Sequence, residues 1–300
     1  MTTMTATGTM GTATRLGPVP GVLASMRAEA RRVRKWPAVW ITLGAWLALS
    51  AMFGYLFNYL AYTTGSGNFA TEGQSRAALL ASIMPGAVPD VLIDGMPMFG
   101  GALMMVLGAL VAGNGYGWGT WKTIFTQGPS RVSAVLGSLL TLAGVVVAVV
   151  IVTLGFDLGL SLIVAATESQ QVVWPSLAAV SQSVGAGLLV MGMWAMFGYL
   201  LGTLARGPAL SVGLGLIWAL VIENLLRGVG SMLGFVDTLT HFLPGTAAGS
   251  LVGSLVRGGS GDTPGVVAAI SGERAVWTLA AYIVVLPLLS LVLVRRRDVA

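Results

Sequence analysis

The sequence predicts an all-α membrane protein with six transmembrane helices. Of its 300 residues, 55% are hydrophobic and only 9% are charged, whereas a soluble globular domain carries about 25% charged residues. The apolar residues also fall in uninterrupted runs, as long as a helix needs to cross a hydrocarbon core about 30 Å thick. A surface so poor in charge would not keep a chain of this size in solution, so these observations indicate an integral membrane protein.

Two segments precede the first span. Residues 1–20 are rich in Thr, Gly and Met with a single charge, and we interpret them as a disordered N-terminal tail. In residues 21–37, apolar positions recur at helical spacing and arginines occupy the other face, which predicts an amphipathic helix lying in the membrane interface. The apolar positions are Val22, Met26, Ala30 and Val33, and the arginines are Arg27, Arg31 and Arg34. Pro37 then marks a bend into the membrane.

Residues 38–300 form the predicted six-helix domain. The first span has no charged residue and has tryptophans near its start and tyrosines near its end, as expected for a helix whose ends lie among lipid headgroups. The predicted spans are residues 38–60, 96–112, 133–156, 177–204, 208–226 and 276–294. Small residues four apart, such as Gly198 and Gly202 or Gly108 and Ala112, favour close approach of helix backbones.

The basic residues predict the orientation. With the N-terminus in the cytoplasm, twelve of the sixteen Lys and Arg residues lie on the cytoplasmic side and most acidic residues lie outside. This distribution predicts a multi-pass membrane protein with both termini in the cytoplasm. The net charge of +5 then indicates contact with anionic membrane lipids rather than with nucleic acid. The excess of arginine over lysine is typical of a GC-rich genome, such as an actinobacterial one.

The long outer segment before the last span is mixed in character. Residues 231–256 are apolar enough to touch lipid, yet they contain Asp237, His241 and Pro244. This pattern predicts a broken, partly inserted pair of short helices, re-entrant from the extracellular side, rather than a seventh span.

Several chemistries are excluded by composition. The chain has no cysteine and one histidine, so it has no disulfide, no thiol nucleophile and no zinc site of the HExxH type. Its two lysines, Lys35 and Lys122, follow Arg34 and Trp121, whereas a Walker A motif needs Gly-Lys. We therefore expect no catalytic residue, no cofactor site and no metal site in this chain.

The connection between the second and third predicted spans, residues 115–131, is the most informative stretch. Thr120 can cap a short helix that Gly128 and Pro129 end. Such a helix would present aromatic and apolar groups beside one lysine, which a groove on a partner protein can hold. The alternative is an interfacial connector whose tryptophans lie at the headgroups.

This stretch resembles the first cytoplasmic loop of the permease subunits of ABC-2-type (type V) ABC exporters. That loop commonly carries Glu-Tyr-x-x-Gly-Thr, a short helix, and then Pro-x-x-Arg or Pro-Ser-Arg. The chain has Tyr116, then Gly119-Thr120, and later Pro129-Ser130-Arg131. The amphipathic N-terminal segment is similar to the family's elbow helix, and Arg296-Arg297-Asp298 is similar to its closing motif. One position departs, because Gly115 stands where the family usually has glutamate.

The resemblance implies that ATP binding and transport are carried out by different subunits. A separate ABC ATPase subunit would bind ATP and Mg, and a second permease copy, identical or a paralogue, would complete the transporter. The complex would move a lipophilic or amphipathic substrate such as a drug, lipid or peptide outwards, as in multidrug efflux. The residues implied to couple to the ATPase are Tyr116, Trp118, Gly119, Thr120, Trp121, Lys122, Ile124, Phe125 and Arg131.

The same resemblance implies a substrate path along the dimer interface, lined by the second and fifth spans. Candidate contacts are Phe99, Met104, Met105 and Glu223, with ordinary packing as the alternative for the methionines.

Two acids lie inside apolar runs. At 1.5 Å per residue, Asp157 is expected at the outer interface and Glu223 in the outer half of the membrane. We expect structural roles, with Arg227 pairing to Glu223 four residues earlier; a cation-substrate or proton site is the alternative. His241, four residues after Asp237, is expected to be an interfacial residue.

Other functions remain as alternatives. A self-contained secondary carrier or channel would need ionisable or broken helices at the midplane. An intramembrane hydrolase would need a serine in a span, whereas Ser260 lies in a polar Gly/Ser-rich loop. A scaffold or immunity protein could use the same fold without transport.

Overall fold

The computed structural model describes residues 18–65, 74–117, 119–121, 123, 130–230, 232–256 and 263–296. All regular elements within these residues are helical, which confirms the all-α part of the predicted fold class. The helices are α1 (Pro18–Lys35), α2 (Pro37–Leu49), η1 (Ser50–Leu56), α3 (Phe57–Thr64), α4 (Arg76–Ser82), η2 (Pro85–Ala87), α5 (Val88–Asp94), η3 (Met96–Gly100), α6 (Gly101–Gly117), α8 (Arg131–Thr167), α9 (Leu177–Ala205), α10 (Pro208–Leu216), η4 (Ile217–Ile222), α11 (Glu223–Gly230), α12 (Gly234–Thr240), α13 (Pro244–Leu255) and α14 (Gly272–Arg296).

Among the residues that the structure describes, six helical stretches are long and apolar enough to cross a membrane, which supports a multi-pass membrane protein. They are Pro37–Thr64, Met96–Gly117, Arg131–Thr167, Leu177–Ala205, Pro208–Gly230 and Gly272–Arg296. Each contains or closely overlaps one predicted span. The third was predicted too short, because α8 continues past Asp157 to Thr167. Its 37 residues reach about 55 Å, so α8 is much longer than a hydrocarbon core is thick.

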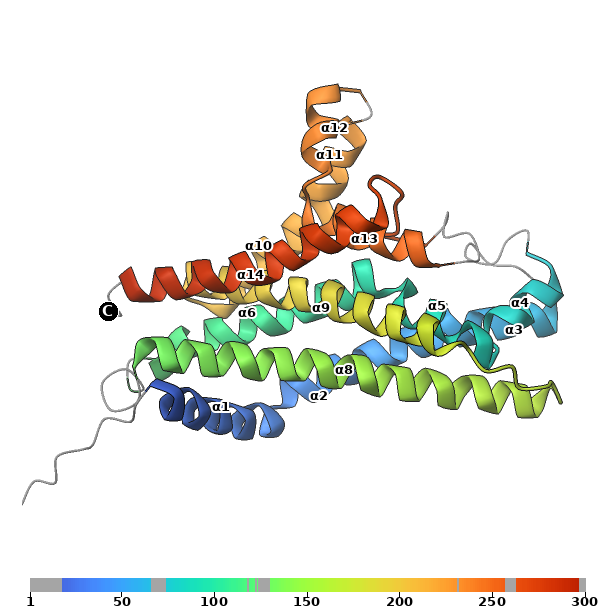
Figure 1. Cartoon of the computed structure of the whole chain (residues 1–300), viewed down its shortest axis with the longest axis horizontal. Helices are drawn as coiled ribbons and strands as arrows, with labels where there is room; N and C mark the ends of the chain where they lie inside the picture. The colour runs from blue at the N-terminus through green and yellow to red at the C-terminus, as the bar shows by residue number, and fades with distance from the viewer. Residues whose placement is uncertain are drawn as a thin grey trace, which may run out of the picture.

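The core of the bundle is the contact between α6 and α9, which lie side by side along the long axis (Figure 1). A Cβ atom added to Gly198 would lie 1.9 Å from the carbonyl oxygen of Met105, and one added to Gly108 would lie 2.1 Å from that of Ala195. The small-residue faces predicted on these two helices therefore meet each other, backbone against backbone.

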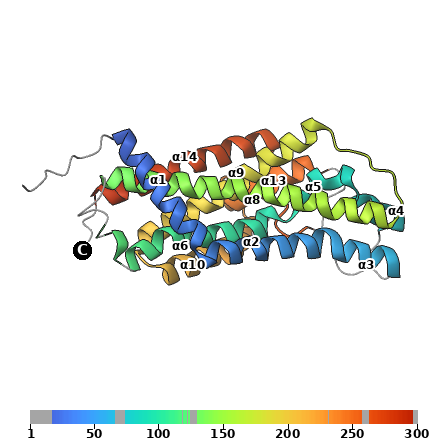
Figure 2. The same cartoon turned by 90° about the horizontal axis from the view of Figure 1, so that it is seen from below.

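The N-terminal helix α1 crosses the start of α8 (Figure 2). It is separated from α2 by Trp36, whose extended backbone precedes Pro37 at the first position of α2. Proline is favoured there because the first helical N–H has no intrahelical acceptor. The predicted bend at Pro37 is thus present.

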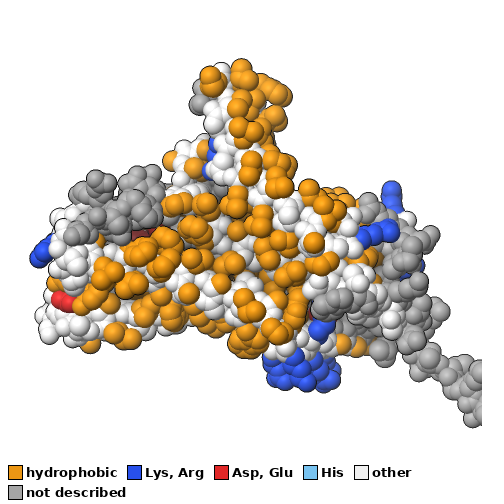
Figure 3. Space-filling view, turned by 180° about the vertical axis from the view of Figure 1, so that it is seen from behind, with side chains coloured by type: hydrophobic (Ala, Val, Ile, Leu, Met, Phe, Trp, Pro, Cys, Tyr) orange, Lys and Arg blue, Asp and Glu red, His pale blue; other side chains and the backbone are white. Residues whose placement is uncertain are grey.

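Two helices stand away from the bundle at the top of Figure 1. We call α11 and α12 the α11–α12 arm. Hydrophobic side chains cover much of it, whereas Lys and Arg side chains gather at the opposite edge, where α1 lies (Figure 3). The most exposed apolar side chains of the arm and its connection are Leu225, Met232, Leu233 and Phe235. The predicted pair of short helices corresponds to α12, which is largely exposed, and α13, which is largely buried.

Candidate functional site

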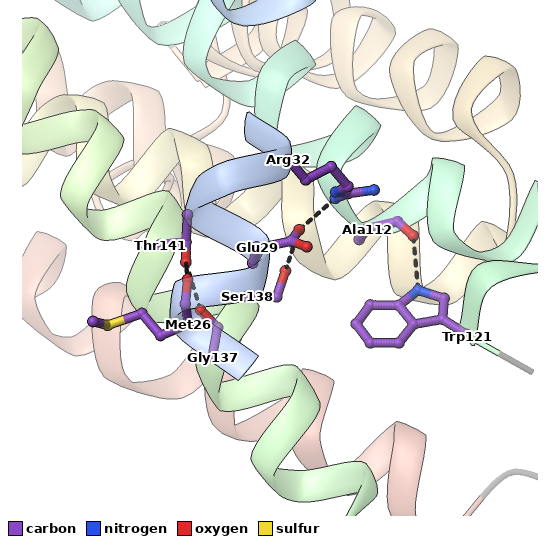
Figure 4. A network of polar contacts seen from close by, with 8 residues as sticks. All are labelled: Met26, Glu29, Arg32, Ala112, Trp121, Gly137, Ser138 and Thr141. Atoms are coloured by element: carbon purple, nitrogen blue, oxygen red, sulfur yellow. Dashed lines mark hydrogen bonds and ion pairs between the residues drawn. The ribbon is translucent and has the colours of Figure 1, made fainter. Parts of the chain in front are cut away.

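The candidate site lies at one end of the bundle, where α1, the end of α6 and the start of α8 come together (Figure 4). The Trp121 indole Nε1 donates a hydrogen bond to the carbonyl oxygen of Ala112 on α6, at 3.2 Å. Its ring lies 6.2 Å from the ring of Tyr116, centroid to centroid. Trp121 is only 7% exposed, so this side chain fixes the connection to α6 and is not presented on the surface.

Gly115 explains how the indole fits there. A Cβ atom at this position would lie 2.2 Å from Trp121 Nε1 and 2.6 Å from Cδ1. No side chain larger than hydrogen is compatible with such distances unless the indole moves. Any side chain at position 115 would therefore displace the Trp121 indole from the place that it occupies.

The turn before Trp121 begins one residue earlier than predicted. The Gly119 carbonyl oxygen accepts from the Thr123 N–H at 3.3 Å, so Gly119, rather than Thr120, is the first residue of this turn. Gly119 has a φ of +65°, a conformation that glycine adopts without strain. Gly119 is exposed, and Thr120 is partly buried.

At the other side of the site, polar contacts join α1 to α8 (Figure 4). The Thr141 hydroxyl donates to the carbonyl oxygen of Met26 at 3.2 Å, and Ser138 Oγ donates to Glu29 Oε1 at 3.4 Å. Glu29 also pairs with Arg32 on α1. The helices approach closely at Gly137, where a Cβ atom would lie 2.5 Å from the Cβ of Ser25. The arrangement holds α1 firmly along the first turns of α8.

Of the other predicted coupling residues, the structure describes Arg131 but not the remaining four. Arg131 is the first residue of α8. Ser130 caps this helix, because its Oγ accepts a hydrogen bond from the Ser133 N–H at 3.1 Å. Trp118, Lys122, Ile124 and Phe125 lie outside the described residues, as do Pro129 and the Arg297-Asp298 part of the closing motif.

The four predicted substrate contacts have different surroundings in the structure. Met104 and Met105 are fully buried, and the Met105 sulfur lies against Gly215 of α10, where a Cβ atom would be 2.5 Å from it. The structure thus places both methionines in helix packing, the alternative that the sequence left open. Phe99 stacks on Phe53, with ring centroids 5.6 Å apart.

Glu223 is also fully buried, and its carboxylate joins two elements. Oε1 accepts from Trp218 Nε1 at 3.0 Å and from the backbone N–H of Gly245 at 3.2 Å. Oε2 lies 3.7 Å from Arg227 Nη2, which confirms the predicted pair. A carboxylate at the N-terminus of a helix is favourable, so Glu223 anchors α13. His241 Nε2 lies 3.8 Å from Asp237 Oδ2, one helical turn earlier.

Asp157 is buried between α8 and the π-helical segment η1. Its Oδ1 accepts from Ser50 Oγ at 2.8 Å, and its backbone carbonyl accepts from the Tyr55 hydroxyl at 3.0 Å. Its Oδ2 has no hydrogen-bond partner among the described residues. The burial was not expected, because the helix rise alone predicted an interfacial position.

The sequence did not reveal the partners of either acid. Ser50 lies 107 residues from Asp157, and Gly245 lies 22 residues from Glu223. A local signal existed only for Trp218, which precedes Glu223 by five residues; this is the spacing that a π-helical turn brings together.

Neither a comparison with protein-family models nor one with curated proteins found a match to this chain. Within the described residues, no group of three His, Asp or Glu side chains could hold a metal ion.

Proposed function

We propose that this chain is the permease subunit of an ABC-2-type exporter of the bacterial plasma membrane. A separate ATPase subunit would bind ATP and Mg, and a second permease copy, identical or a paralogue, would complete the path. The substrate would be lipophilic or amphipathic, such as a drug, lipid or peptide. The chain itself would carry no catalytic residue.

The observation that supports this proposal is the attachment of the start of the α6–α8 connection to α6. The connection begins with a turn at Gly119 that is fixed to α6 by the buried Trp121, and α1 is fixed to α8 at the same end. A turn that is held against α6 in this way can transmit a push from a partner to that helix. Under the predicted orientation this end faces the cytoplasm, where an ATPase would lie.

Two further parts complete the proposal. Helix α1 would act as an elbow helix in the cytoplasmic interface, because Arg27, Arg31 and Arg34 lie on one exposed face. Helices α12 and α13 would enter the membrane from outside as a re-entrant pair before α14.

Co-purification tests the proposal. The permease, tagged and expressed with the ATPase encoded beside it, should elute as a complex that hydrolyses ATP. Lys122→Glu in the connection should reduce assembly or turnover, whereas Arg295→Glu, the same charge reversal at the end of α14, should not. If the purified chain binds no ATPase, or if both variants behave like wild type, the proposal is wrong.

One observation favours a second candidate, a self-contained secondary carrier. The buried Asp157 has an oxygen without a hydrogen-bond partner among the described residues, and buried ionisable groups in membrane proteins commonly bind protons or cations. Transport by the purified chain in vesicles without ATP, abolished in Asp157→Asn, would support the carrier.

A further inference from the structure

An open groove of about 620 Å³ runs along one side of α14. Eight of the nine residues that line it lie within or just before α14, and the ninth, Phe242, comes from the connection between α12 and α13. The groove is distinct from the proposed coupling site, because it begins at the opposite end of α14 from its C-terminal arginines.

Two contacts hold the Phe242 wall in place. The Tyr282 hydroxyl donates to the carbonyl oxygen of Phe242 at 2.8 Å. The guanidinium carbon of Arg274 lies 5.2 Å from the centroid of the Phe242 ring, within the range of a cation–π interaction. These anchors are eight residues apart on α14, about 12 Å along its axis. The groove is therefore formed before any ligand binds.

One end of the groove is charged. Glu273 and Arg274 line it at the first turn of α14, beside Ser271. Within the part of the chain that the structure describes, neither of the two forms an ion pair. A guanidinium binds phosphate well, with two parallel hydrogen bonds, and a carboxylate attracts an ammonium group. The two unpaired charges match a zwitterionic headgroup.

Apart from Thr278 and the Tyr282 hydroxyl, the rest of the groove is apolar. Trp277, Ala281 and Val285 follow along the same side of α14, and Trp277 is 70% exposed. From Arg274 to Val285 the helix rises about 16 Å, roughly half of a hydrocarbon core of about 30 Å. The groove thus has the length of one leaflet, with its charged end at the helix end and a tryptophan at the depth where interfacial aromatics lie.

We propose that this groove binds one phospholipid of the phosphatidylethanolamine class. Its phosphate contacts Arg274, its ammonium contacts Glu273, and one acyl chain lies along Trp277, Ala281 and Val285. Ordinary lipid contact differs from this site in two ways: the Phe242 wall is preformed, and the headgroup meets two unpaired side chains of opposite charge. The site does not depend on the proposed transport function, so its test needs no ATPase.

Native mass spectrometry of the full chain tests this site. The protein is purified in detergent, mixed with equal amounts of phosphatidylethanolamine and phosphatidylglycerol of identical chains, and the retained lipids are counted. Wild type should retain one phosphatidylethanolamine in preference to phosphatidylglycerol. In Arg274→Gln the retained fraction should fall roughly tenfold, and it should be unchanged in the control Arg295→Gln.

Two further measurements separate the parts of the site. Glu273→Gln should abolish the preference for phosphatidylethanolamine while retaining a phospholipid. Glycerophosphoethanolamine, which has the headgroup without acyl chains, should not displace the bound lipid. Thermal unfolding checks that each variant is folded.

Equal retention in wild type and Arg274→Gln would overturn the proposal, as would a preference for phosphatidylglycerol. A dimer that forms without lipid and whose cross-links map to Trp277 would also overturn it, because a second copy would then cover the groove.

Discussion

Replacing Gly115 by alanine would test the packing of the Trp121 indole against α6. The new Cβ atom would lie 2.2 Å from Trp121 Nε1 and 2.7 Å from Cε2, whereas ordinary contacts of a Cβ atom are 3.4–4 Å. The indole must therefore move by about 1 Å or more. Its 3.2 Å hydrogen bond to the Ala112 carbonyl would then be lost.

The expected cost is a balance of three effects. Overpacking a tight site costs about 1–3 kcal/mol, and a lost hydrogen bond adds about 1 kcal/mol. Alanine returns up to about 1 kcal/mol, because it is a better helix former than glycine. We expect the free energy of unfolding to fall by about 1–3 kcal/mol.

Gly117→Ala is the matched control on the same last turns of α6. A Cβ atom there would have Pro208 Cδ at 3.6 Å as its nearest neighbour, an ordinary contact. Because only the gain in helix propensity remains, this variant should be as stable as wild type or more stable by up to about 1 kcal/mol.

Reversible unfolding in mixed micelles of a mild detergent and dodecyl sulfate, followed by circular dichroism, measures these differences. A double-mutant cycle with Trp121→Ala isolates the contact. Once the indole is absent, Gly115→Ala should no longer destabilise the protein. If Gly115→Ala costs the same in both backgrounds, or no more than Gly117→Ala, the indole does not occupy the space above Gly115 and the account of the site is wrong.

Three other predictions concern the bundle. Gly198→Ala should lower the unfolding temperature sharply, since the added methyl group meets the α6 backbone at 1.9 Å, whereas Gly185→Ala, with nothing within 4 Å, should not. Ser50→Ala should lower the free energy of unfolding by about 1–3 kcal/mol in the same assay, because it removes the hydrogen bond to Asp157 Oδ1. Asp157→Asn keeps an acceptor for Ser50 and should cost less. The reverse order would contradict the assigned hydrogen bond. Glu223→Ala should increase hydrogen exchange in α13, which loses its N-terminal anchor, and unchanged protection there would count against the anchor.

Features that depend on local spacing could be predicted from the sequence. The six apolar runs gave six long helices, because length and hydropathy are properties of each segment alone. The Glu223–Arg227 and Asp237–His241 pairs followed from residues four apart on one helix face. Gly198 indicated close packing by its spacing, but not which helix it would meet.

Features that depend on tertiary contacts could not be predicted. The burial of Trp121 requires the space above Gly115, which exists only when the chain folds back on α6. Aromatic residues in a short polar connection fit a surface helix equally well, so composition alone favoured exposure. Likewise, the full burial of Met104 and Met105 reflects the neighbours that α9 and α10 supply.

Both buried acids of the spans lie next to a π-helical segment, and the geometry of that segment explains their contacts. In a regular α-helix with 3.6 residues per turn, residues five apart point about 140° away from each other. A π-helical turn, with i→i+5 hydrogen bonds, brings such residues to the same side. Ser50 and Tyr55, five apart in η1, can therefore both bond to Asp157. Trp218 in η4 reaches Glu223 by the same spacing. Because the 3.6-residue periodicity used to assign helix faces separates these residues, the two polar clusters become visible only when the backbone conformation is known.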